Sequence, residues 1–273
     1  MRRLIDAGIR AFELSSFVRP DLIPGLADAE EVFAKVPRVP GLRLGCCVGN
    51  VRGLARADIG RSTAESLAEL ERMAAFADGH DIVLGTYIVF AWGGPTGPAR
   101  AGEDLRPLAR RLVDIGVDHW ILADSAGYAA PPQVRDLVTA ALAYVPADNL
   151  TVQIHDGRGM GLAALLPLLD LGVRHIDTAL AGSGGHPAMP GAQGGGVCTK
   201  DAVQLLELAG VRTGIDLPRL IDAAELAGRR GPRAGQGIRP AHRPGTWRRP
   251  GRRAARLHLV NRPDDTTAGP HPP

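Results

Sequence analysis

The chain has 273 residues, of which 45% are hydrophobic and 22% are charged, a composition typical of a globular protein with one large buried core. Its longest apolar runs are short and are broken by glycine, proline or charge, which excludes a membrane span and a signal peptide. We therefore expect a cytoplasmic protein with no membrane partner.

The net charge of +3 is distributed unevenly. Residues 229–273 contain eleven arginines and two aspartates and carry +9, so residues 1–228 carry −6. The proline- and glycine-rich composition of this segment predicts a disordered tail. Two interpretations of it stay open: a selected basic arm, or the product of out-of-frame translation of GC-rich DNA. Binding to nucleic acid is the less favoured role.

Strand-like and helix-like runs alternate from the start of the chain to about residue 228. In chain order the patterns predict helix 1–8, strand 10–17, helix 27–34, strand 42–48, helix 62–77, strand 82–90, helix 105–115, strand 119–124, helix 132–144, strand 151–155, helix 160–171, strand 174–178, and helices 199–209 and 217–227. Such alternation indicates a parallel sheet with helical crossovers, as either a closed (β/α)8 barrel or an open doubly wound sheet.

The cysteines are Cys46, Cys47 and Cys198, and their number and spacing fit neither a disulfide framework nor a structural zinc site. We expect reduced thiols, with Cys46 and Cys47 packed in a buried strand. No glycine-rich dinucleotide or P-loop motif follows a predicted strand, so nucleotide phosphate binding lacks its usual support.

Polar side chains gather where the predicted strands end, which is the functional edge of parallel α/β folds. They are Glu13–Ser16, Asn50, Asp124 and His155–Asp156, with a glycine-rich stretch after Thr178. This mixture of carboxylate, amide and imidazole groups suits a hard divalent cation and an oxygen-rich substrate. Each residue alone also has a structural explanation, such as capping of a turn by Asp124 or an ion pair of Glu13.

Five motifs, in order, resemble the hydroxymethylglutaryl-CoA lyase family, whose barrel is also described as pyruvate carboxyltransferase-like. They are Leu4-Ile-Asp-Ala-Gly8 with Phe12-Glu-Leu-Ser-Ser-Phe-Val18, Asn50-x-x-Gly53, Ala123-Asp-Ser-Ala-Gly127, Ile154-His-Asp-x-x-Gly159 and Asp177-Thr-Ala-Leu-Ala-Gly-x-Gly-Gly185. The resemblance covers nearly all of residues 1–228. It implies a TIM-barrel lyase domain in which Mg²⁺ or Mn²⁺ assists retro-Claisen cleavage of a hydroxyacyl-CoA.

The sequence departs from the family pattern at several points. The first strand with its Arg-Asp pair is absent, and a further strand is missing between Gly60 and Arg61, which predicts an incomplete barrel with about six of eight strands. The family's His-x-His motif reads Gln153-x-His155, its loop cysteine is replaced by His186, and its asparagine ligand position falls near Gly196. We therefore expect the divalent metal to be held weakly or lost.

From this resemblance we predict Glu13, Asp124 and His186 as catalytic residues, Ser16 and Asn50 as substrate contacts, and His155 and Gln153 as metal ligands. The expected reaction converts a 3-hydroxy-3-carboxyalkyl-CoA to an acyl-CoA and a keto acid. The alternatives are an inactive or truncated member of the family and a Claisen-type synthase or aldolase of the same superfamily. The expected partners are a small acyl-CoA or hydroxy-acid substrate and, by family resemblance, a second copy in a homodimer.

Overall fold

The computed structural model describes residues 1–16, 24–47, 63–80, 82–94, 97–98, 105–185 and 194–230. Six parallel strands lie within these ranges: β1 (Ala11–Ser16), β2 (Arg43–Cys47), β3 (Gly85–Ile88), β6 (His119–Ala123), β7 (Leu150–Gln153) and β8 (His175–Asp177). A short antiparallel hairpin, β4 (Gly93–Gly94) with β5 (Gly97–Pro98), follows β3.

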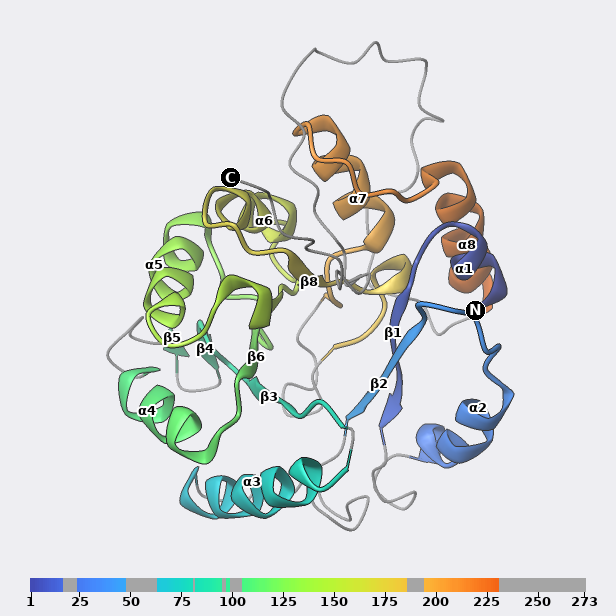
Figure 1. Ribbon diagram of the computed structural model, residues 1–273. Helices are drawn as coiled ribbons and strands as arrows, with labels where there is room; N and C mark the ends of the chain where they lie inside the picture. The colour runs from blue at the N-terminus through green and yellow to red at the C-terminus, as the bar shows by residue number, and fades with distance from the viewer. Residues whose placement is uncertain are drawn as a thin grey trace, which may run out of the picture.

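The six parallel strands form two sheets around one interior instead of a single closed barrel (Figure 1). One sheet pairs β1 with β2, and the other has the order β3-β6-β7-β8. In the described part of the chain no ladder joins the two sheets, which leaves one seam between β2 and β3 and another between β8 and β1. These are the two places where the sequence predicts a missing strand, so the prediction of an incomplete α/β barrel is confirmed.

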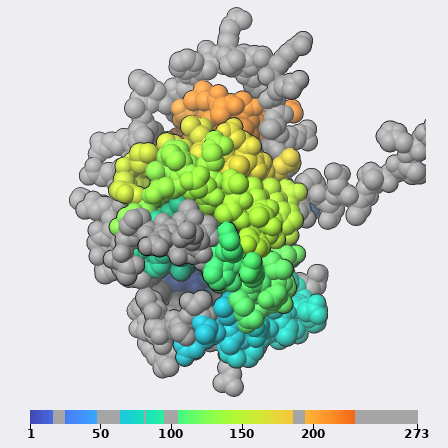
Figure 2. All heavy atoms as spheres, turned by 90° about the vertical axis from the view of Figure 1, so that its left-hand side faces the viewer, coloured from blue at the N-terminus to red at the C-terminus, as the bar shows by residue number. Residues whose placement is uncertain are grey.

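The helices form a more complete layer than the strands. They are α1 (Arg2–Asp6), α2 (Ala29–Lys35), α3 (Thr63–Asp78), α4 (Leu105–Ile115), α5 (Pro131–Leu142), α6 (Gly161–Asp170), α7 (Thr199–Leu208) and α8 (Leu217–Arg230). Each helix from α3 to α8 packs on the next, α8 packs on α1, and α2 packs on β1. Figure 2 shows part of this layer, with α3 below and α7 above.

Local sequence explains where the helices start and end. The helix α4 ends before Gly116, whose φ of +82° is a left-handed conformation that glycine adopts without strain. The helix α5 begins with Pro131, and the side chain of Gln133 accepts a hydrogen bond from the backbone amide of Ala130 at 3.1 Å. The expected helices are therefore found, with ends shifted by one to three residues at most positions.

The buried core belongs mainly to the four-stranded sheet. Its largest fully buried members include Trp120, Leu122 and Leu150 from the strands and Leu165 and Leu168 from α6. A smaller cluster of Ala7, Val203 and Leu220 fastens α1 to α7 and α8. Among the described residues, no side chain of β1 or β2 belongs to either cluster, so the two-stranded sheet is held chiefly through its flanking helices.

Two expectations from the sequence are wrong in detail. The buried strand expected at 82–90 is only the four residues of β3, and Ile82 and Val83 before it are 54% and 86% exposed. The physical reason is the seam, because β3 pairs with β6 on one side and has no described strand on the other. Cys46 and Cys47 are half-buried and not packed in a core, for the same reason.

No described helix is both long enough and apolar enough to cross a membrane. Residues 231–273 lie outside the described part of the chain, so the disorder expected of the basic tail stays a prediction. The helix α8 extends to Arg230, just beyond the predicted domain boundary at residue 228.

Candidate active site

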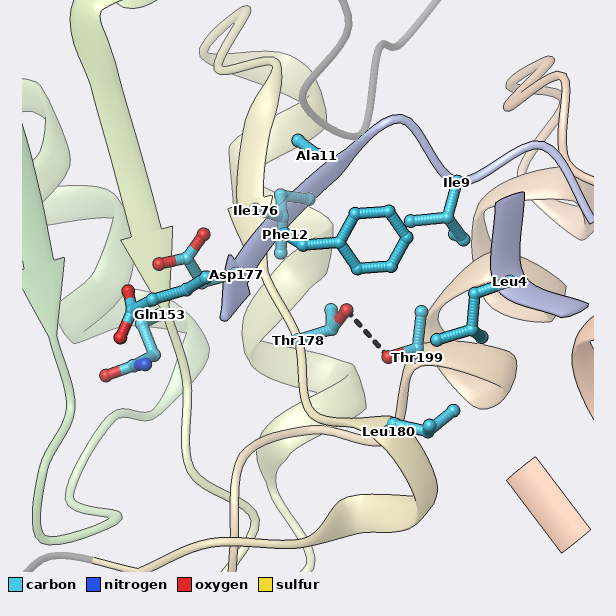
Figure 3. Close-up of a pocket in the computed structure, with 11 residues that line it drawn as sticks. Leu4, Ile9, Ala11, Phe12, Gln153, Ile176, Asp177, Thr178, Leu180 and Thr199 are labelled. Carbon is cyan, nitrogen blue, oxygen red and sulfur yellow. Dashed lines mark hydrogen bonds between the residues drawn. The ribbon is translucent and has the colours of Figure 1, made fainter. Parts of the chain in front are cut away.

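A cavity of about 300 Å³ opens at the seam between β8 and β1. Figure 3 shows Phe12, Ile9 and Leu4 on one side of it and Asp177 and Gln153 on the other. Its full lining is Leu4, Ile9, Ala11, Phe12, Glu13, Gln153, Ile176, Asp177, Thr178, Leu180 and Thr199. The cavity therefore has an apolar part near α1 and a polar part at the ends of β7 and β8.

Four polar side chains meet inside the barrel, beside the polar part of this cavity. The carboxylate of Glu13 on β1 accepts hydrogen bonds from the Tyr87 hydroxyl on β3 and from the Cys47 thiol on β2, the latter at 3.0 Å. The Tyr87 hydroxyl also lies 3.3 Å from Oδ2 of Asp177 on β8. These contacts join strands of both sheets, so the cluster spans both seams.

The surroundings favour the protonated forms of Asp177, Tyr87 and Cys47. Burial, and then the charge of Glu13, raise the pKa of the Asp177 carboxyl from 3.8 to about 7, although the contact with Tyr87 acts in the opposite direction. Burial and the charges of Asp177 and Glu13 raise the pKa of the Tyr87 phenol. Burial and Glu13 likewise raise the pKa of the Cys47 thiol. Tyr87 and Cys47 therefore keep their protons at neutral pH and act as hydrogen-bond donors.

A bulge in β1 shifts its register with β2. The pairing with β2 shifts between Glu13 and Ser15, so Leu14 has no partner across the ladder. As a result, Glu13 and Ser16 both reach Cys47: the hydroxyl of Ser16 donates to the carbonyl oxygen of Cys47 at 3.3 Å.

His155 lies just after β7, where its ring is held by the loop after β6. Its Nδ1 is 3.2 Å from the carbonyl oxygen of Ser125, so Nδ1 donates and Nε2 keeps its lone pair. Burial lowers the pKa of His155, and the bond to Ser125 and the charge of Asp124 oppose this only in part. The imidazole is therefore neutral near pH 7, the form that can bind a metal or accept a proton.

Asp124 is completely buried at the end of β6. Its two carboxylate oxygens accept hydrogen bonds from the backbone amides of Tyr128 at 2.7 Å and Ala129 at 3.1 Å. Burial raises the pKa of Asp124 while these amides lower it. Through these contacts Asp124 caps the loop after β6, whose residue Ser125 holds the ring of His155. The predicted role of Asp124 in proton transfer stays a prediction.

Gln153 and His155 are the described candidates for metal binding, both at the carboxyl end of β7. No group of three or more histidine, cysteine, aspartate or glutamate side chains with metal-binding geometry occurs in the described ranges. A hard divalent cation prefers six oxygen-rich ligands. The described residues alone therefore do not complete such a site, and we derive no reaction step through a metal.

Two predicted residues, Asn50 and His186, lie outside the described residues. The glycine-rich segment after His186 is partly described and packs against the site. Gly196 pairs with His155 through an isolated bridge. A Cβ atom on Gly195 would lie 2.3 Å from the carbonyl oxygens of Gly182 and Ser183, so only glycine fits there.

The sequence interpretation overlooked three members of the polar cluster, Tyr87, Asp177 and Cys47, the last of which was expected only to pack in a buried strand. Asp177 begins one of the five family motifs and, like Asp124, lies where a strand ends. Its position at a strand end could have identified it as a candidate site residue. Tyr87 lies inside a short strand, and no pattern in the sequence distinguishes it from a core aromatic residue.

Comparison with known proteins identifies the family of the chain. The model of the HMGL-like family matches residues 55–227. The chain belongs to the HMGL-like family. The family resemblance inferred from the five motifs is therefore confirmed.

Curated relatives match most of the chain. The (R)-citramalyl-CoA lyase of Chloroflexus aurantiacus is 34% identical, over 82% of this chain and 80% of that protein. The hydroxymethylglutaryl-CoA lyase YngG of Bacillus subtilis is 30% identical, with 82% of each chain covered. The relatives that carry the HMGL-like resemblance are thus lyases of CoA thioesters.

Solved structures show the same fold. The HMG-CoA lyase of Bacillus subtilis has a TM-score of 0.76 at 30% identity, with 83% of each chain covered. The HMG-CoA lyase of Acinetobacter baumannii, solved in complex with coenzyme A and 3-methylmalate, has a TM-score of 0.77 at 28% identity, covering 83% of this chain and 81% of that one. Apart from its two seams, the fold of this HMGL-like chain is therefore closely similar to the folds of these HMG-CoA lyases.

Proposed function

We propose that the chain is a carbon–carbon lyase that cleaves a 3-hydroxy-3-carboxyalkyl-CoA into an acyl-CoA and a keto acid. The named activities of its relatives, citramalyl-CoA lyase and hydroxymethylglutaryl-CoA lyase, support this reaction class. The observation that carries the proposal is the position of Glu13: its carboxylate is held by two donors and lines a cavity at the strand ends.

In the proposed reaction, Glu13 acts as the base. It removes the proton of the substrate's C3 hydroxyl, the hydroxyl oxygen forms a carbonyl, and the electron pair of the broken carbon–carbon bond passes to the enolate of the acyl-CoA. A proton then returns to the enolate carbon, and His186 is the predicted donor because an imidazole titrates near neutral pH. Ser16 and Asn50 are the proposed contacts of the substrate's polar groups, and Asp124 remains a proposed member of the acid–base network.

A divalent metal, Mg²⁺ or Mn²⁺, is implied by family resemblance, with the Gln153 side-chain oxygen and His155 Nε2 as proposed ligands. When bound, such an ion stabilises negative charge on the substrate oxygens. Because the described ligand set is incomplete, we expect weak binding. Isothermal titration of the chain with Mn²⁺ should give a weak signal that disappears in His155→Ala. Tight binding that survives this substitution would contradict the ligand assignment.

The test of function is a cleavage assay on the purified chain with hydroxymethylglutaryl-CoA and citramalyl-CoA, measuring acyl-CoA release with and without Mn²⁺. We expect cleavage that Glu13→Gln reduces at least a hundredfold. Glu30→Gln is the matched control, because Glu30 is an exposed glutamate on α2, and it should retain full activity.

The alternatives predict other outcomes of the same assay. Absence of cleavage with both substrates would overturn the proposal and favour an inactive member of the family. Net condensation of an acyl-CoA with a keto acid, without cleavage, would instead identify a synthase.

A further inference from the structure

The side chain of Tyr87 connects parts of the barrel that no described ladder joins. It stands on β3, at the edge of the four-stranded sheet, yet its hydroxyl donates to the carboxylate of Glu13 in the two-stranded sheet. The same hydroxyl lies 3.3 Å from Asp177 at the end of β8. One phenol thus contacts acidic residues on both sides of the seam between β8 and β1.

The two donors to Glu13 differ in strength. A thiol is a weak hydrogen-bond donor, whereas a phenol is a strong one, and its bond to an ionised carboxylate is charge-assisted. Cys47 holds one oxygen of Glu13 at 3.0 Å, and Tyr87 holds the other. The orientation of the carboxylate therefore depends chiefly on Tyr87.

The backbone around Glu13 does little to fix that orientation. Among the described residues its strand pairs only with β2, the bulge at Leu14 interrupts that pairing, and the Glu13 residue itself is exposed. An exposed glutamate side chain has several rotamers of similar energy, and restricting it to one has an entropic cost. The bond from Tyr87 compensates for the weak support from the strand.

We propose that Tyr87 is a positioning residue, which holds the Glu13 carboxylate in the orientation that accepts the substrate's hydroxyl proton. This inference rests on the proposed function, in which Glu13 is the base. The high pKa of the buried phenol supports it, because Tyr87 then remains a donor across the pH range of an assay. Tyr87 itself transfers no proton to the substrate in this scheme.

The first test is kinetic. Tyr87→Phe removes the hydroxyl and keeps the ring, so we expect kcat to fall about tenfold or more while KM changes less than about twofold. Tyr144→Phe is the matched control, since Tyr144 stacks on Trp120 with ring centroids 6.3 Å apart, away from the cavity. It should leave kcat unchanged.

A double-mutant cycle separates positioning from general support of the fold. In the Glu13→Gln background, Tyr87→Phe should have little further effect on kcat, because the group that Tyr87 positions is already absent. Equal losses from Tyr87→Phe in both backgrounds, or a change confined to KM, would overturn the proposal.

A second cycle tests the contact without any activity. The urea midpoints of the parent chain, Tyr87→Phe, Glu13→Ala (which removes the acceptor) and the double variant should be clearly non-additive, whereas Tyr144→Phe and Glu13→Ala should add. If the parent chain cleaves no substrate, the proposed function fails while this cycle still reports on the contact. Additive midpoints for Tyr87 and Glu13 would show that the bond does not form, and the positioning role would fall with it.

Discussion

Asp177 should make the stability of the protein depend on pH in a way that can be calculated. Its carboxyl has a pKa of about 7 in the folded chain and an ordinary value of 3.8. A carboxyl whose pKa is raised by folding favours the folded state fully below pH 3.8, and this contribution is lost as the pH rises through 7. Above that pH the folded protein must hold an unfavourable buried charge.

The size of the effect follows from the difference between the two pKa values. About three units correspond to about 4 kcal/mol at 1.36 kcal/mol per unit. The variant Asp177→Asn keeps the shape and a hydrogen-bond acceptor for Tyr87 but cannot ionise. It should match the parent chain in free energy of unfolding at pH 4 and exceed it by about 4 kcal/mol at pH 8.

The assay is urea denaturation of both chains at pH 4, 5, 6, 7 and 8. The difference between them reports the titration of Asp177 together with its coupling to Glu13, since the other titrating groups are common to both. A difference that stays constant across this range would refute the reasoning, because it would show that the carboxyl titrates alike in the folded and unfolded states.

Three further results are expected. Leu150→Ala, at a fully buried position, should lower the free energy of unfolding by about 2–5 kcal/mol, whereas Leu208→Ala, at a position 62% exposed, should change it by less than about 1 kcal/mol in urea denaturation. Gly195→Ala should displace the loop and reduce cleavage at least tenfold, while Gly228→Ala, with open space around its Cβ, should leave the cleavage rate unchanged. Hydrogen exchange followed by mass spectrometry should show faster exchange in β1 and β2 than in β6 and β7, and equal protection would contradict the view that β1 and β2 stand apart from the core.

Much of the fold was accessible from the sequence because its local signals agree with the final packing. The amphipathic pattern of residues 105–115 with Gly116 gives the bounds of α4 as found. The run 119–124 gives β6, which lies between two paired strands in the four-stranded sheet. The prediction failed at 82–90, where an apolar run predicts a buried strand but no described strand lies on the side that would bury it.

The candidate site was only partly accessible. The position of His155 just after a strand follows from the alternation of strands and helices, whereas Glu13, expected at a strand end, lies inside β1. The partners of Glu13 do not follow from this alternation, because Cys47 and Tyr87 are 34 and 74 residues away in the chain and meet it only through the arrangement of the two sheets. The bulge at Leu14 is equally invisible in the sequence, and it brings Ser16 to the same partner residue as Glu13.

The edge of the sheet before β3 has a practical consequence for solubility. Val83 and Ile82 are 86% and 54% exposed beside a strand that, among the described residues, pairs on one side only. Such an edge is a template on which another molecule can add a strand, so this stretch, more than net charge, should limit the concentration at which the protein stays monodisperse. The substitution Val83→Lys would place a charged side chain in solvent at this edge, and it should make the protein easier to concentrate for crystals or NMR.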